Sequence, residues 1–219
     1  MWFNPNWVLR TIVLGPPVRV IFPTRFVWVS GRMPTRQVIV VAGPHKTAKE
    51  TFIVPAYLWL MEFSIMVKAE AFRGIFKPIL MSFGLIPVER QGGRGKDSFP
   101  FARAALKKGK NLFFWPEATR HGNDDGVHEG KLGAIFLSFE SGVPILPVAV
   151  IGMRGFLRRR YAIVGKPFDV RHELGLLGYA IDTPLEGVVA RLVMERLMRY
   201  IAELALTEYV GNTKRGGKA

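Results

Sequence analysis

Residues 37–45 read Gln37-Val38-Ile39-Val40-Val41-Ala42-Gly43-Pro44-His45, and they are the strongest indication of the architecture. A continuous run of mostly β-branched apolar residues is typical of a strand that is buried on both faces, as in parallel sheets. Glycine and proline then predict a turn, and a helix is expected after it, over residues 47–60. A buried strand, a tight turn and a helix in this order indicate an α/β protein.

The same alternation continues on both sides of this segment. Further strands are predicted at residues 25–29, 65–67, 85–88, 111–115, 143–151 and 161–164. Further helices are predicted at residues 76–83, 99–108, 131–141 and 185–207. This order favours one α/β domain with a largely parallel mixed sheet flanked by helices. We therefore expect three parts: an N-terminal segment over 1–24, the domain over 25–210, and a flexible basic tail over 211–219.

The charge is strongly positive. Lys and Arg together number 31 and Asp and Glu 17, which gives a formal net charge of +14 over 219 residues. Such a surface favours anionic partners, namely nucleic acid, acidic lipid headgroups or phosphorylated small molecules. The chain has no cysteine, which excludes disulfides, thiolate catalysis and cysteine-based zinc sites. No two of its four histidines have the i, i+4 spacing of a helical metal site, so no metal is expected.

The N-terminal part combines apolar and aromatic residues with arginines. Between residues 7 and 28 the arginines are Arg10, Arg19 and Arg25, and Pro16-Pro17 is expected to break the segment. This pattern suits a bent pair of short helices lying in a bilayer interface, and it equally suits a helix packed on the domain's own core. No signal peptide is apparent, and no run is long enough for a confident membrane span.

His45 lies on the predicted turn between strand and helix, with Glu50 five residues later. An imidazole can act as the base for a hydroxyl nucleophile, and a carboxylate can hold its other ring nitrogen. The alternative is structural, because Thr47-Ala48-Lys49-Glu50 has the spacing of a capping box, in which Glu50 satisfies the start of the helix. Spacing alone does not separate these two interpretations.

Three later blocks contain further candidates. Gly84-Leu85-Ile86-Pro87-Val88-Glu89-Arg90 brings an arginine to a glycine-rich basic loop, where it binds phosphate or is a solvated surface residue. Phe114-Trp115-Pro116-Glu117-Ala118-Thr119-Arg120 follows a strand, where α/β sheets bind ligands, or it is a salt-bridged loop. Val143-Pro144-Ile145-Leu146-Pro147-Val148 is a core strand that can also shape a pocket.

Taken together, the four blocks resemble the glycerolipid acyltransferase family, which is typified by enzymes acting on 1-acylglycerol-3-phosphate. The family pattern is His-x4-Asp, then Gly-x-Ile-Pro-Val-x-Arg, then Phe-Pro-Glu-Gly-Thr-Arg, then Val-Pro-Ile-x-Pro-Val. The resemblance extends from about Val38 to Gly152. The chain departs from the pattern where Glu50 stands for the usual Asp and Ala118 for the usual Gly, and Gly43-Pro44 precedes His45 where Asn is common.

The resemblance implies a role for each matched residue. His45 would be the general base and Glu50 its orienting partner. Arg90 would bind the phosphate of the acceptor. The remaining implied substrate-binding residues are Glu117 and Arg120 in the same pocket, Lys131 beside the phosphate, and Pro147 shaping the acyl or acceptor site.

The resemblance also implies the reaction, in which an acyl group passes from acyl-CoA or acyl carrier protein to the hydroxyl of a lysophospholipid. No cofactor is expected. The partners would be the acyl thioester, the lysophospholipid and an anionic membrane surface, with the protein peripheral or monotopic on the cytoplasmic face. Two alternatives remain, a non-catalytic lipid-binding protein of the same fold and a basic nucleic-acid-binding protein. No recognised nucleic-acid motif accompanies the charge, so no nucleic acid is expected.

Overall fold

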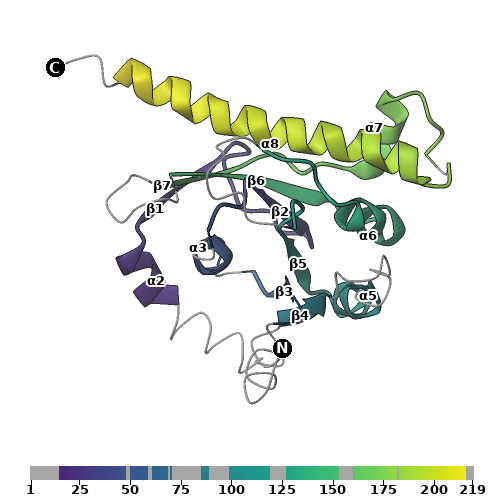
Figure 1. Cartoon of the computed structure of the whole chain (residues 1–219), viewed down its shortest axis with the longest axis horizontal. Coiled ribbons are helices and arrows are strands. Elements are labelled where there is room, and N and C mark those ends of the chain that lie inside the picture. Colours follow the sequence, from purple (N-terminus) through teal and green to yellow (C-terminus); the bar gives the residue numbers. More distant parts are fainter. Residues whose placement is uncertain are drawn as a thin grey trace.

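A computed structural model describes most of the chain and shows one sheet with helices on both faces (Figure 1). The described residues are 15–47, 50–58, 61–68, 70, 85–88, 99–118, 127–152, 160–181 and 183–215. The predicted helix at residues 76–83 lies outside them.

The sheet has seven strands in the order β1-β7-β6-β2-β5-β3-β4. All neighbouring strands are parallel except β6 and β7, which are antiparallel. This confirms the predicted α/β class with a largely parallel mixed sheet. The strands are β1 (Thr24–Trp28), β2 (Ile39–Gly43), β3 (Phe63–Lys68), β4 (Leu85–Val88), β5 (Asn111–Phe114), β6 (Ile145–Ile151) and β7 (Arg160–Val164).

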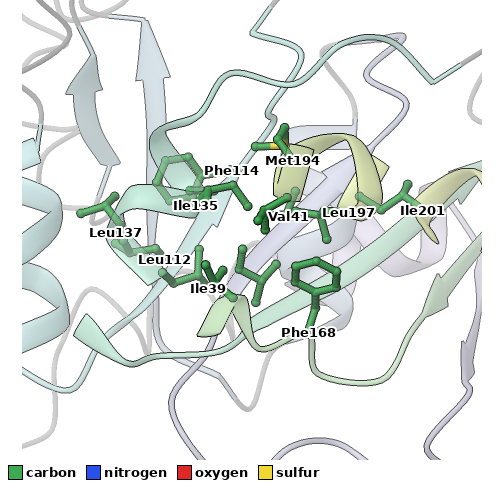
Figure 2. Packing of buried hydrophobic residues seen from close by; sticks show 14 of the residues in the cluster. Ile39, Val41, Leu112, Phe114, Ile135, Leu137, Phe168, Met194, Leu197 and Ile201 are labelled. Atoms are coloured by element: carbon green, nitrogen blue, oxygen red, sulfur yellow. The ribbon is translucent and has the colours of Figure 1, made fainter. Parts of the chain in front are cut away.

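The two faces of the sheet carry separate hydrophobic clusters, because successive side chains of a strand point to opposite faces. Ile39 and Val41 of β2 pack with residues of α5, α6, α7 and α8, as Figure 2 shows for α6 and α8. Val40 and Ala42 pack instead with residues of α3. The helices are α2 (Gly15–Ile21), α3 (Glu50–Tyr57), α5 (Phe99–Lys107), α6 (Gly133–Ser141), α7 (Val170–Leu176) and α8 (Gly187–Arg215).

The helix α2 begins beside Pro16-Pro17, and the expected break of the N-terminal segment there stays a prediction. Both prolines lie inside the helix at its first turn, where the missing N–H groups have no intrahelical acceptor anyway. The guanidinium of Arg19 donates to the carbonyl oxygen of Ala56, which fastens α2 to α3. Val20 and Ile21 nevertheless remain 80% and 50% exposed. Insertion of residues 1–24 into a membrane stays a prediction, and residues 1–14 lie outside the described part.

Two helices differ from the sequence prediction. The short helix α7 was not predicted; Asp169 caps it by accepting the N–H groups of Arg171 and His172. The last helix begins at Gly187 and continues to Arg215, beyond the predicted end at residue 207. A single glycine such as Gly211 costs a helix about 1 kcal/mol and does not by itself end it. Residues 211–215, expected in the flexible tail, are therefore helical. Among the described helices, none has the length and apolar character needed to cross a bilayer.

Candidate active site

The candidate site lies where two neighbouring parallel strands end. His45 follows β2, and the segment from Trp115 to Ala118 follows β5, which pairs with β2 along Ile39–Val41. The carboxyl ends of parallel strands meet at one edge of the sheet, where α/β proteins bind ligands. Segments that are about 70 residues apart in the sequence therefore lie together at this edge.

His45 and Glu50 form a close pair. The Nδ1 atom of His45 lies 2.9 Å from Oε2 of Glu50. Two backbone N–H groups, from Lys46 and Thr47, also donate to this carboxylate, so it acts as an acceptor. Nδ1 must then carry the proton in the neutral imidazole, which leaves the lone pair on Nε2. The geometry thus directs a basic nitrogen away from Glu50.

The two interpretations of Glu50 are compatible, because its two carboxylate oxygens have different partners. Oε1 accepts the N–H of Thr47 at 3.0 Å, which is the contact expected of a capping box. Oε2 accepts the N–H of Lys46 and meets the imidazole of His45. The glutamate therefore caps the helix and orients the histidine in the same conformation.

The burial of this pair strengthens its electrostatic interaction. Glu50 is fully buried and the His45 side chain is 12% exposed. A buried carboxylate is stable only when hydrogen bonds replace its hydration, and here the turn supplies them. A protonated His45 would be stabilised by this carboxylate more strongly than in water, since the surroundings are less polar.

Glu117 is a second buried carboxylate at the site, 4% exposed. Its Oε2 accepts the backbone N–H of His45 at 3.1 Å, and its Oε1 accepts the backbone N–H of His128 at 3.4 Å. The side chain thus supports the backbone of the histidine turn. Its predicted contact with substrate stays a prediction.

Trp115 is a residue that the sequence analysis did not assign to the site. Its ring stacks on the imidazole of His45, with centroids 4.4 Å apart and planes inclined by 15°. It occupies the position of the phenylalanine in the family's third block. This departure from the family pattern was the sequence signal that could have drawn attention to Trp115. The next residues form a turn in which Ala118, at the usual glycine position, has a positive φ of 59°.

The other predicted site residues are placed less directly. Lys131 is exposed, and its backbone N–H donates to the carbonyl oxygen of Pro116 at 2.8 Å, so its segment adjoins the third block. Pro147 is buried within β6, opposite Val41 of β2. Arg90 and Arg120 lie outside the described residues. The structure therefore brings together His45, Glu50 and Glu117, and the substrate contacts of the other four residues stay predictions.

The donor atoms at this edge suit proton transfer. Across the part of the chain that the structure describes, no three His, Asp or Glu side chains are grouped so that they could hold a metal ion. The available chemistry is an oriented imidazole with an accepting nitrogen, backed by a buried carboxylate. Such an arrangement can remove a proton from a hydroxyl group and later return it to a leaving group.

A family model and two curated relatives all indicate the acyltransferase family. The model of the acyltransferase family matches residues 27–151, more than half of the 219-residue chain. The chloroplastic 1-acyl-sn-glycerol-3-phosphate acyltransferase BAT2 of Brassica napus is 28% identical over 121 residues, covering 55% of this chain and 33% of its own length. The chloroplastic LPAT1 of Arabidopsis thaliana, with the same named activity, is 33% identical over 121 residues, covering 55% and 32%. The match thus spans about a third of these relatives.

A solved structure supports the fold. The crystal structure of the 1-acyl-sn-glycerophosphate acyltransferase PlsC from Thermotoga maritima superposes with a TM-score of 0.60. The superposition covers 87% of this chain and 76% of the other, at 20% sequence identity. The likeness extends beyond the segment matched in sequence.

Proposed function

This chain belongs to the acyltransferase family, and from that premise we propose that it transfers a fatty acyl group from an acyl thioester to the hydroxyl of a lysophospholipid. The acceptor we propose is 1-acylglycerol-3-phosphate, the substrate named for both plant relatives. The reaction would serve phospholipid biosynthesis. The donor is acyl-CoA or acyl carrier protein, and the net charge of +14 suits either anionic donor.

The observation that supports this function best is the contact of 2.9 Å between Nδ1 of His45 and the buried carboxylate of Glu50. It holds the imidazole in the tautomer that leaves Nε2 able to accept a proton. It also provides a charge that stabilises the imidazolium once it has formed. A protein that only binds lipid does not need an oriented base of this kind.

The proposed mechanism uses His45 twice. The acceptor hydroxyl gives its proton to Nε2 while its oxygen attacks the thioester carbonyl carbon. The tetrahedral intermediate then collapses, the carbon–sulfur bond breaks, and the departing thiolate takes the proton from Nε2. The products are the acyl ester and the free thiol, and His45 returns to its neutral form. No residue of the protein is acylated, which is consistent with the absence of cysteine.

We assign phosphate recognition to basic residues of the later blocks. Arg90 and Arg120 are the proposed ligands of the acceptor phosphate, because a guanidinium can bind two phosphate oxygens at once. Lys131 would add a further positive charge. Its side chain is exposed, and its backbone contacts the third block at Pro116. Glu117 and Pro147 complete the proposed pocket.

The acceptor lipid resides in a bilayer, so the site must reach a membrane surface. We propose a peripheral or monotopic association with the cytoplasmic face. Val20 and Ile21 of α2 expose apolar surface, and the net charge of +14 attracts anionic lipid.

The decisive experiment is an acyl-transfer assay on the purified full chain. A labelled acyl-CoA and a labelled acyl–acyl carrier protein are each offered to 1-acylglycerol-3-phosphate and to monoacylglycerol, which lacks the phosphate. We expect transfer to the phosphorylated acceptor. His45→Ala should lower turnover by roughly 10²–10⁴-fold while the protein stays folded. Wild-type protein that acylates neither acceptor would refute the function, and an active His45→Ala variant would refute the mechanism.

A further inference from the structure

The imidazole of His45 has an aromatic neighbour as well as an acidic one. The indole of Trp115 lies parallel to it at 4.4 Å between centroids, while Glu50 binds at the ring edge through Nδ1. The two contacts act on different parts of the ring. One covers a face and the other occupies one nitrogen, so rotation of the imidazole is opposed about two axes.

Trp115 is itself held by packing. Its ring meets the buried ring of Phe113 edge to face, at 5.4 Å and 75°. Its indole Nε1 is buried and has no hydrogen-bond acceptor among the described residues. Among the described residues the ring is therefore held by packing, and it presents its aromatic surface to His45.

An indole face attracts a cation much more strongly than a neutral ring. The π system is electron-rich on its faces, and tryptophan provides the strongest such site among the aromatic residues, within about 6 Å of the centroid. In the proposed reaction His45 is neutral before proton transfer and cationic in the transition state. A stack with Trp115 would therefore stabilise the transition state more than the ground state, which is the condition for raising kcat.

We propose that Trp115 is a positioning residue that aligns the imidazole of His45 and stabilises the imidazolium through its indole face. This inference rests on the proposed acyl transfer. It also gives a physical consequence to the tryptophan at the phenylalanine position of the third block, since phenylalanine has the weaker π face of the two. Glu50 and Trp115 then share the stabilisation of one cation from two directions.

The test varies the electron density on the indole face while keeping the shape of the ring. Tryptophan analogues with one to four fluorine atoms are incorporated at position 115 alone, because the chain has five tryptophans. Fluorine withdraws electrons from the face and changes the ring volume little. We expect log kcat to fall with each added fluorine, to a total loss of about fivefold to thirtyfold, with KM little changed. A kcat that is independent of fluorination would overturn the proposal.

Two controls separate this effect from packing. The same analogues at Trp28, on the far edge strand β1, should leave kcat unchanged. Trp115→Phe should retain more activity than Trp115→Leu, because only the former keeps a π face over His45; equal loss in both would contradict the proposal. If the wild type transfers no acyl group, the proposed function fails. If the wild type is active, His45→Ala is inactive and fluorination has no effect, only the role of Trp115 fails.

Discussion

The carboxylate of Glu117 accepts the backbone N–H of His45 at 3.1 Å, although the two residues are 72 positions apart in the sequence. The other oxygen of the same carboxylate accepts the backbone N–H of His128. Glu117 thus joins the turn after β2 to a segment that follows the third block. The turn that carries the candidate base is held at its backbone by Glu117 and at its side chain by Glu50.

Glu117→Gln should impair both stability and activity. A carboxamide has one accepting oxygen, so either His45 or His128 would face an NH₂ group and lose its acceptor. An unsatisfied buried donor costs about 1–3 kcal/mol, and the displaced turn should lower kcat. Denaturant unfolding and the transfer assay measure the two effects. Glu140→Gln is the matched control, since Glu140 pairs with Arg103 on the surface, where loss of an ion pair has an effect below about 1 kcal/mol. Equal behaviour of both variants would contradict the role assigned to Glu117.

Glu50→Gln separates capping from catalysis. The amide oxygen can still accept the N–H of Thr47, so α3 should form. The NH₂ group cannot accept the proton of Nδ1, and the imidazole of His45 is then free to adopt the tautomer that protonates Nε2. The N–H of Lys46 would lose its acceptor, which should lower the free energy of unfolding by about 1–3 kcal/mol. We expect turnover to fall by roughly 10²-fold or more, well beyond this change in stability, with circular dichroism close to wild type. Unchanged turnover would leave Glu50 with only its structural role.

Ala118→Gly should stabilise the protein. Ala118 has a positive φ of 59°, a conformation that costs a residue with a Cβ about 1–2 kcal/mol and costs glycine nothing. We expect the free energy of unfolding to rise by about 1 kcal/mol. Ala104→Gly, at an exposed position in the helix α5, should instead lower it by about 0.5–1 kcal/mol. Destabilisation by both substitutions would show that Ala118 is not strained in solution.

Arg90→Ala and Arg120→Ala should each weaken recognition of the acceptor phosphate. Loss of a guanidinium contact should raise the KM for 1-acylglycerol-3-phosphate, and it should lower kcat as well if the contact tightens in the transition state. The preference over monoacylglycerol should fall in parallel. Arg199→Ala, which removes an exposed arginine from α8, is the control and should keep the preference. A preference that survives both arginine substitutions would place the phosphate elsewhere.

The exposed apolar residues of α2 should matter for membrane binding. The double change of Val20 and Ile21 to serine preserves the contact between Arg19 and Ala56 that holds α2 in place. Basic residues contribute about 1 kcal/mol each near an anionic surface, and salt screens this term, whereas apolar burial is not screened. In vesicle flotation at high salt, this variant should bind less than wild type. The control is the double change of Ile181 and Val188 to serine. These residues are 60% and 75% exposed and lie near the start of α8. An equal loss in both variants would contradict a specific role for α2.

Local sequence was sufficient for the class of fold and for the central pair of the site. The apolar run over β2, with its β-branched residues, is typical of a strand buried on both faces, and its residues are buried in the structure. His45 and Glu50 are five residues apart across one turn, so their contact depends on local chain geometry. The helix α7 was missed because its capping residue Asp169 precedes only seven helical residues, too few for a clear periodic pattern.

The contacts from β5 to β2 depended on tertiary structure. Nothing near His45 in the sequence indicates that Glu117 would bind its backbone or that Trp115 would cover its ring. Both contacts arise because the strand order places β5 beside β2, while β3 and β4, which come between them in the chain, are added on the outer side of β5. Strand order is set by the burial of whole faces of the sheet, and local sequence does not specify it. The sequence by itself therefore determined the close pair of His45 and Glu50, and only the assembled sheet supplied the residues that hold this pair.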